Sequence, residues 1–189
     1  MSDTEARRYT PLYEGMIVRY AALVAAQRFI AQTGEAGPVC VVEIGVGSGV
    51  TSNEIVHDLI RRQVSYQFIG VDNMEEGPTA AINFRYPNMA LIDGDSTDPA
   101  VIAQVPDEIH FLYVDGDHKY EGVASDVRHY GPKVVPGFLM GMHDIALTGA
   151  RQVMNELLQT ADWKLHFETC ERTAPNDMTP GLAILEKRG

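Results

Sequence analysis

The stretch Val39-Cys40-Val41-Val42-Glu43-Ile44-Gly45-Val46-Gly47-Ser48-Gly49 joins an apolar run, in which Glu43 is the one polar residue, to three closely spaced glycines. Such a run, closed by glycine, is typical of a central parallel strand that is covered on both faces. We therefore expect a strand over 38–44, a tight turn over 45–49 and a helix over 50–62. In such a turn a ligand can reach the backbone, and the free N–H groups of the helix start suit a carboxylate or a phosphate.

The spacing of these glycines limits the kind of ligand. The dinucleotide-binding fingerprint needs a glycine three positions after Gly47, where this chain has Val50. The third glycine comes at Gly49 instead, so a nicotinamide or flavin cofactor is disfavoured. A glycine-rich turn alone is a weak signal, and a tight turn without any ligand is the alternative interpretation.

The rest of the chain alternates between strand-like and helix-like patterns. Further strands are predicted over 67–71, 89–92, 109–114 and 133–142, with helices near 79–84, after Pro99, and over 120–130 and 149–158. Repeated strand-then-helix units imply right-handed crossovers and a parallel sheet. The last two strands, 164–170 and 182–186, are joined only by a Pro-, Asn- and Gly-rich loop, which predicts an antiparallel hairpin. The predicted fold is α/β: a doubly wound, mostly parallel seven-stranded sheet with a C-terminal antiparallel hairpin.

The length of the chain favours one domain. At 189 residues, 45% of them hydrophobic, a single domain over 1–189 is expected, because two domains would both be undersized. Residues 1–34 are predicted to be an N-terminal helical segment, with apolar residues at helical spacing over 12–32. Four large side chains of this segment could cover a ligand cleft, pack on the edge of the sheet or form a dimer interface. A homo-oligomer is therefore possible. These side chains are Tyr9, Tyr13, Met16 and Tyr20.

The composition excludes some partners. Acidic residues outnumber Lys and Arg by 26 to 15, giving a net charge of −11, whereas nucleic-acid binding needs dense basic surfaces. A nucleic-acid partner is therefore disfavoured. The absence of a long apolar run argues against a membrane partner. Cys40 and Cys170 lie in apolar runs, which favours buried free thiols over a disulfide. Free thiols fit a reducing compartment, so a cytoplasmic location is expected.

Polar residues follow the predicted strands. In an open α/β sheet the ligand lies beyond the carboxyl ends of the strands, so these residues are the candidates for function. Asp72 ends the second strand, where a carboxylate can accept hydrogen bonds from ribose hydroxyls, and Asp95 follows the third, where it can accept from an adenine amino group. Aspartates at such positions also often serve only to fix a loop, which is the alternative. The remaining clusters lie at 115–118 and 143–144.

These motifs, in this order, resemble those of class I S-adenosylmethionine (SAM) methyltransferases. The segments Val114-Asp115-Gly116-Asp117-His118-Lys119-Tyr120-Glu121-Gly122-Val123 and Val135-Pro136-Gly137 to His143-Asp144 are similar to the small O-methyltransferase family that includes macrocin-type and cephalosporin-hydroxylase-like proteins. The resemblance implies a SAM site in which the glycine turn holds the methionine end, Asp72 the ribose and Asp95 with Ser96 the adenine. The residues expected in the turn are Glu43, Gly45, Gly47, Ser48 and Gly49.

The same resemblance implies a divalent cation, Mg²⁺ or Mn²⁺, bound by Asp115 together with His143 and Asp144, and His118 as general base. This chain departs from the more usual acidic pair, because a histidine stands at position 143. An Asp, His and Asp set also suits manganese, iron or zinc. Consecutive residues of an extended strand point in opposite directions, so both side chains can face one ion only if the strand has already turned.

We expect a methyl transfer to a hydroxyl group of a small molecule, assisted by the cation. Neutral hydroxyls are poor nucleophiles at pH 7, so a base must take the proton; Lys119 is the second choice after His118. Helix capping by Asp117 and loop fixing by Asp144 are the alternatives at these two sites. For the whole protein, the alternatives are a non-catalytic SAM-binding protein and a hydroxylase-like enzyme or dehydrogenase on the same fold.

Overall fold

The computed structural model describes residues 12–34, 37–74, 84, 86–169 and 181–189. Within these residues, helices and strands alternate from the first strand onward, as expected. The elements are α1 (Leu12–Thr33), β1 (Val39–Ile44), α2 (Val50–Arg61), β2 (Tyr66–Asp72), β3 (Met89–Asp93), α4 (Pro99–Ile102), β4 (Ile109–Val114), α5 (Tyr120–Tyr130), the 3₁₀ helix η1 (Gly131–Lys133), β5 (Val134–His143), α6 (Thr148–Gln159), β6 (Trp163–Thr169) and β7 (Leu182–Lys187).

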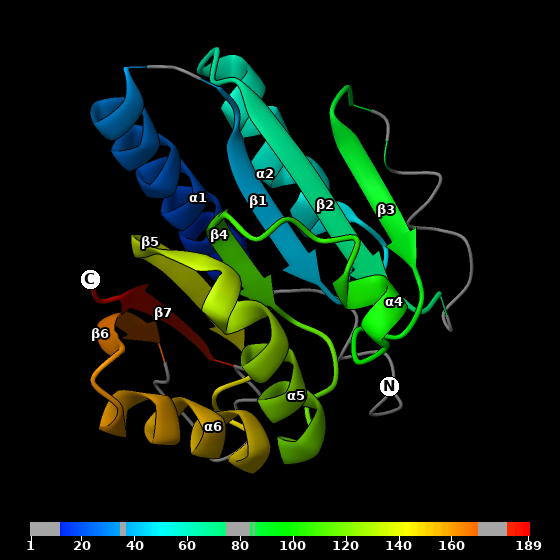
Figure 1. Ribbon diagram of the computed structural model, residues 1–189, viewed down its shortest axis with the longest axis vertical. Coiled ribbons are helices and arrows are strands. Elements are labelled where there is room, and N and C mark those ends of the chain that lie inside the picture. The colour runs from blue at the N-terminus through cyan, green and yellow to red at the C-terminus, as the bar shows by residue number, and fades with distance from the viewer. Residues whose placement is uncertain (1–11, 35–36, 75–83, 85, 170–180) are drawn as a thin grey trace.

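All seven strands form one sheet in the order β3-β2-β1-β4-β5-β7-β6 (Figure 1). The first five strands in this order are mutually parallel, and β7 pairs antiparallel with both β5 and β6. The predicted fold class is therefore confirmed. Every residue of β1 and β4 is buried, because helices cover both faces of the sheet centre. The chain leaves β1 towards β3 and returns at β4, so the carboxyl ends of β1 and β4 form the topological switch point at which ligands bind.

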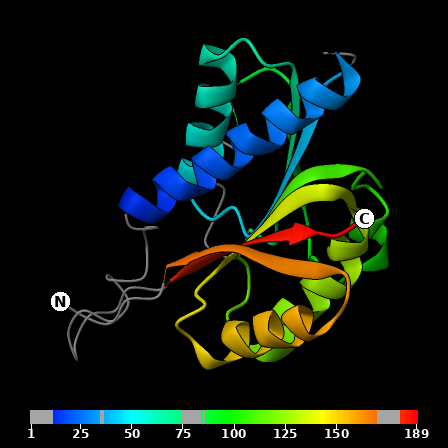
Figure 2. The ribbon, with the colours of Figure 1, turned by 90° about the vertical axis from the view of Figure 1, so that its left-hand side faces the viewer.

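Two layers of helices enclose the sheet (Figure 2): α1 and α2 lie on one side, and α5 and α6 lie on the other. The face of α1 that packs on the sheet is rich in alanine, and Ala21, Ala22, Ala25 and Ala26 are all buried. Short side chains bring this helix close to β4 and β5. Near its end, Arg28 is 3.0 Å from Glu186 of β7, which ties the helix to the antiparallel edge of the sheet.

Most predicted element ends agree with the structure to within one or two residues. At the start of β5, Lys133 belongs to η1, and the strand begins one residue later than predicted. Pro132 fixes a helical φ there and prolongs the turn beyond α5. Cys40 is a buried free thiol, as predicted. Among the described helices, none is long and apolar enough to cross a bilayer. The helix near 79–84, Cys170, the loop before β7 and Tyr9 fall outside the described residues, apart from Phe84 and Gly181 at the segment ends.

Candidate functional site

The glycine turn after β1 is shaped by three residues with positive φ. Gly45, Gly47 and Gly49 have φ values of 82°, 53° and 75°, which glycine adopts at little cost. A Cβ atom on Gly45 would lie 2.3 Å from the backbone oxygen of Asp115, whereas one on Gly47 would meet nothing within 4 Å. Gly45 therefore allows the turn to touch the end of β4, and Gly47 presents bare backbone to open space.

Asp72, at the end of β2, braces this turn. Its Oδ2 accepts hydrogen bonds from the backbone N–H groups of Val46 and Gly47, both at 2.8 Å. Its Oδ1 accepts from the N–H of Met74 at 2.7 Å. The carboxylate thus lies beside the turn as the sequence predicts, and part of its accepting capacity already holds the turn in shape. Its ribose contact stays a prediction.

Glu43 lies behind the turn rather than on it. The residue is 1% exposed, and its carboxylate accepts a hydrogen bond from the hydroxyl of Ser52 in α2. Burial raises its pKa to about 8. The sequence interpretation placed Glu43 among the cofactor contacts, but in this structure it has almost no surface to offer a ligand. It fits a role in supporting the turn from below.

The segment after β3 is held by a buried acid that the sequence analysis did not identify. Asp95 is exposed, and its Oδ1 accepts from the N–H and hydroxyl of Thr97, which lowers its pKa. The Ser96 hydroxyl donates to Asp126 of α5 at 2.6 Å, and the Ser96 carbonyl accepts from Tyr130 at 2.7 Å. Asp126 is 1% exposed, and burial raises its pKa to about 6. Ser96 is therefore fixed from α5, while Asp95 forms a local turn.

Asp115, His143 and Asp144 come together at the carboxyl ends of β4 and β5. Potential ligand atoms of the three side chains all lie within 4.8 Å of one another. His143 is the last residue of β5, and Asp144 has a φ of 54°. The chain thus leaves the extended conformation at Asp144, which lets two consecutive side chains point to the same place. This turn meets the condition that strand geometry imposes on such a pair.

The donor set of this cluster fits a divalent cation. His143 Nδ1 lies 2.8 Å from Asp115 Oδ1 and 3.6 Å from Asp144 Oδ2. Nδ1 therefore lies at ion-pair distance from Asp115, in an orientation that does not form a well-aligned hydrogen bond. Burial opposes a charge on His143, but the Asp115 carboxylate outweighs it and raises the pKa well above the usual value. Two carboxylates and one imidazole nitrogen suit borderline metals such as Mn²⁺.

His118 borders the cluster from the loop before α5. Its Nδ1 pairs with Asp144 Oδ2, and its side chain remains 49% exposed. This hydrogen bond to Asp144 raises the pKa of His118. Asp117 accepts from the backbone N–H of Lys119 at 3.0 Å, which forms a local turn before α5, whereas the N-cap residue is Lys119 and its side chain makes no capping hydrogen bond. Among the described residues, the exposed side chain of Lys119 has no hydrogen bond or ion pair.

Glu14, in the first turn of α1, reaches the same cluster and was not identified from the sequence. Its Oε2 lies 3.2 Å from His143 Nε2, and it is fully buried. An acidic residue in the first turn of a helix is common on exposed surfaces, where it favours the helix dipole. No signal in the sequence therefore set it apart. The N-terminal helix contributes to the site through this residue, whereas Met16 and Tyr20 are largely exposed.

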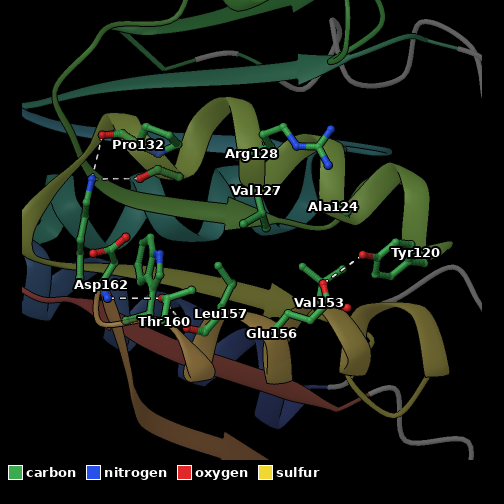
Figure 3. Close-up of a pocket in the computed structure, with 13 residues that line it drawn as sticks. Tyr120, Ala124, Val127, Arg128, Pro132, Val153, Glu156, Leu157, Thr160 and Asp162 are labelled. Atoms are coloured by element: carbon green, nitrogen blue, oxygen red, sulfur yellow. Dashed lines mark hydrogen bonds between the residues drawn. The ribbon is translucent and has the colours of Figure 1, made fainter.

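A groove of about 510 Å³ lies elsewhere, between α5 and α6 (Figure 3). Tyr120 lies at one end, where its hydroxyl donates to Glu156 at 3.0 Å, and Pro132, Thr160 and Asp162 lie at the other. None of the predicted site residues lines this groove. Trp163, which is 5% exposed, lines the groove and belongs to the core. The groove is thus separate from the glycine turn and from the cluster of Asp115, His143 and Asp144.

The fold, with its glycine turn and polar strand ends at the switch point, defines a doubly wound protein of the class I methyltransferase type. Residues 42–145, more than half of the chain, match the family described as a methyltransferase domain. The chain therefore belongs to the methyltransferase domain family. The sequence matches none of the curated proteins with which it was compared.

Solved structures share this fold at low sequence identity. An O-methyltransferase from Bacillus cereus in complex with SAH has a TM-score of 0.70 and 11% identity, over 97% of this chain and 84% of that one. An rRNA methylase from Streptococcus thermophilus has a TM-score of 0.64 and 14% identity, over 80% and 88%. MycE from the mycinamycin biosynthetic pathway, in complex with Mg, SAH and mycinamycin VI, has a TM-score of 0.54 and 17% identity, over 86% and 48%. The shared fold thus serves different acceptors.

Proposed function

We propose that this protein is a SAM-dependent O-methyltransferase that methylates a hydroxyl group of a small molecule with the help of a divalent cation. The observation that carries the proposal is the direct contact between the glycine turn and Asp115, which only a glycine at position 45 permits. This contact joins the expected cofactor turn to the Asp115, His143 and Asp144 cluster. A methyl donor on the turn and a hydroxyl at the cluster would therefore be neighbours.

The cofactor would lie along the carboxyl ends of β1, β2 and β3. Gly45, Gly47, Ser48 and Gly49 would bind the methionine end, Asp72 the ribose, and Asp95 with Ser96 the adenine. The open space at Gly47 and the fixed position of Ser96 support this placement. Methyltransferase structures with SAH bound, such as that from Bacillus cereus, support the choice of cofactor.

Asp115, His143 and Asp144 would hold the cation. When bound, the cofactor supplies a methyl group on a positively charged sulfur that keeps the electron pair of the broken bond, and the cation lowers the pKa of the acceptor hydroxyl. The magnesium in the MycE complex supports a metal in this fold, and the two carboxylates that face His143 Nδ1 support one in this chain. The imidazole favours manganese or another borderline metal over magnesium.

His118 would take the proton of the acceptor hydroxyl. Because Asp144 engages Nδ1, the nitrogen left to accept a proton is Nε2. Catalytic bases are often oriented by a neighbouring carboxylate in this way. The side chain of His118 is half-exposed, so an acceptor can approach it, whereas the side chains of Asp115, His143 and Asp144 are mostly buried. The net charge of −11 favours a small-molecule acceptor over a nucleic acid.

The test compares two neighbouring exposed residues. Calorimetry should detect binding of SAM and of its demethylated product, S-adenosylhomocysteine (SAH), to the wild type, and SAH release should report turnover with a panel of catechols and sugar hydroxyls. His118→Ala should keep SAH affinity and lose about 10²-fold or more in turnover. Lys119→Ala should keep both.

Three outcomes would contradict the proposal. Full activity of His118→Ala would reject His118 as the base. Turnover that a chelator leaves unchanged would reject the metal. A thermal shift with NAD, but none with SAM or SAH, would favour a dehydrogenase instead.

A further inference from the structure

The start of α1 places a fully buried carboxylate between two strand ends. Glu14 Oε2 lies 3.2 Å from His143 Nε2 at the end of β5. Its Oε1 accepts a hydrogen bond from the backbone N–H of Gly181, just before β7, at 2.9 Å. A buried carboxylate is costly unless its oxygens are engaged by donors. Glu14 is therefore held in a defined position, with one oxygen on the backbone and the other on the imidazole.

The two nitrogens of His143 face different partners. Nε2 faces Glu14, while Nδ1 faces the carboxylates of Asp115 and Asp144. A metal ion can bind His143 only at a nitrogen that carries no proton, so the metal-bound imidazole is the neutral form, with its one proton on the other nitrogen. A carboxylate can only accept, so Glu14 favours the proton on Nε2. The lone pair is then on Nδ1, which is the buried nitrogen without a well-aligned hydrogen bond.

We propose that Glu14 is a positioning residue of the metal site, which fixes His143 in the tautomer whose Nδ1 can bind a divalent cation with Asp115 and Asp144. This inference rests on the cation of the proposed function and adds to it a residue that acts through His143. Carboxylates that hold a ligand histidine in this way typically contribute 10- to 100-fold in metal affinity. The N-terminal helix is then part of the metal site.

The experiment uses Mn²⁺ as the probe and the full chain as the protein. The dissociation constant is measured from the electron paramagnetic resonance signal of free Mn²⁺, and the nitrogen hyperfine coupling of bound Mn²⁺ reports the imidazole. The wild type should show that coupling, and His143→Ala should lose it. Glu14→Gln keeps the side-chain shape but cannot accept from both His143 and Gly181. We expect it to bind Mn²⁺ roughly 10-fold more weakly, and Glu14→Ala up to roughly 100-fold.

Three controls separate positioning from general damage to the fold. Arg28→Leu removes the ties from α1 to Glu186 and to the Gly137 carbonyl of β5, six residues before His143, and should leave the affinity for Mn²⁺ unchanged. SAH affinity should stay within about twofold in Glu14→Gln, because the glycine turn is intact. In a His143→Ala background, Glu14→Gln should have no further effect on Mn²⁺ binding, since Glu14 acts through the imidazole.

The outcomes distinguish this inference from the proposed function. If Glu14→Gln binds Mn²⁺ as tightly as the wild type, with the same nitrogen coupling, the role of Glu14 is rejected and the metal site stands. If Arg28→Leu weakens Mn²⁺ binding as much as Glu14→Gln, the effect belongs to helix docking and the inference is overturned. If the wild type binds no Mn²⁺, both the metal in the proposed function and the role of Glu14 fall, while SAH binding still tests the cofactor.

Discussion

Glu43 shows how burial changes the chemistry of a single side chain. Its carboxylate sits in the interior against Ser52, with its pKa raised to about 8. In an unfolded chain the same group titrates near 4.5. Between these two pH values the folded protein holds a proton that the unfolded chain has released. The free energy of unfolding therefore falls as pH rises through this window. The contribution of Glu43 to stability is fully present only below the window.

We predict that Glu43→Gln removes most of this pH dependence. The free energy of unfolding of the wild type should fall between pH 5 and pH 8.5 by an amount on the order of a few kcal/mol, because each pKa unit corresponds to about 1.4 kcal/mol. The variant should show a flatter profile and be more stable than the wild type above pH 8. Asp126, whose pKa burial raises to about 6, and His118 and His143, whose pKa values the neighbouring carboxylates raise, leave a slope of the same sign. Equal slopes in urea titrations of both proteins would contradict the prediction.

Gly47 gives a second prediction at the scale of the residue. Gly47→Ala places a methyl group in the open space of the turn, at a φ of 53°. Gly34→Ala is a matched control, because Gly34 has a φ of 65° and also has no neighbour near its Cβ position, but lies after α1. Both changes should cost about 1–2 kcal/mol in stability from backbone strain. Only Gly47→Ala should weaken SAH binding, by roughly 10-fold, which is about 1.4 kcal/mol. Equal SAH affinities in calorimetry would count against the turn as the cofactor site.

Among the elements, α1 is the one whose role in the site is hardest to predict from the sequence. The sequence pattern left it as a cover, a packing helix or a dimer surface, and the structure shows a helix that packs on β4 and β5 through alanines. This close packing brings Glu14 to the end of β5. The contact joins residues 129 positions apart, and such contacts have no local sequence signal. For the same reason, no local pattern indicates that Asp126 holds Ser96.

A larger side chain on the buried face of α1 should loosen this packing. Ala25 is fully buried, so we expect Ala25→Leu to destabilise the protein by about 1–3 kcal/mol. Ala31→Leu, on the exposed last turn of the same helix, should change stability by less than about 0.5 kcal/mol. Urea denaturation of both variants checks the prediction. Similar losses for both would mean that α1 does not pack as described.

At the scale of the whole molecule, periodicity and turn residues were sufficient to predict the fold. The apolar runs of β1 and β4 are fully buried strands, and the hairpin of β6 and β7 closes the sheet as expected. The grouping of Asp115, His143 and Asp144 followed from the family resemblance, and strand geometry allowed it because parallel strands end at one edge of the sheet. The turn at Asp144 did not follow, because a positive φ at a non-glycine residue depends on its surroundings. The burial of Glu43 was missed because a polar residue next to a glycine turn looks like a ligand.

The described residues share one sheet and one hydrophobic core. The single domain expected from chain length stays a prediction, and it has a direct test. Heating in a calorimeter should give one cooperative transition whose calorimetric and van't Hoff enthalpies agree. SAH should shift the whole transition upward, by an amount that follows from its affinity. Two transitions, only one of which responds to SAH, would show separately folding parts.

The most direct test of the central claim is a crystal structure of the full chain with SAH and Mn²⁺. It should show the adenosyl group along the carboxyl ends of β1 to β3, with Asp72 at the ribose. The Mn²⁺ should lie on Asp115, His143 and Asp144, with the sulfur of SAH facing His118. SAH bound in the groove between α5 and α6, or Mn²⁺ away from these three side chains, would contradict the account.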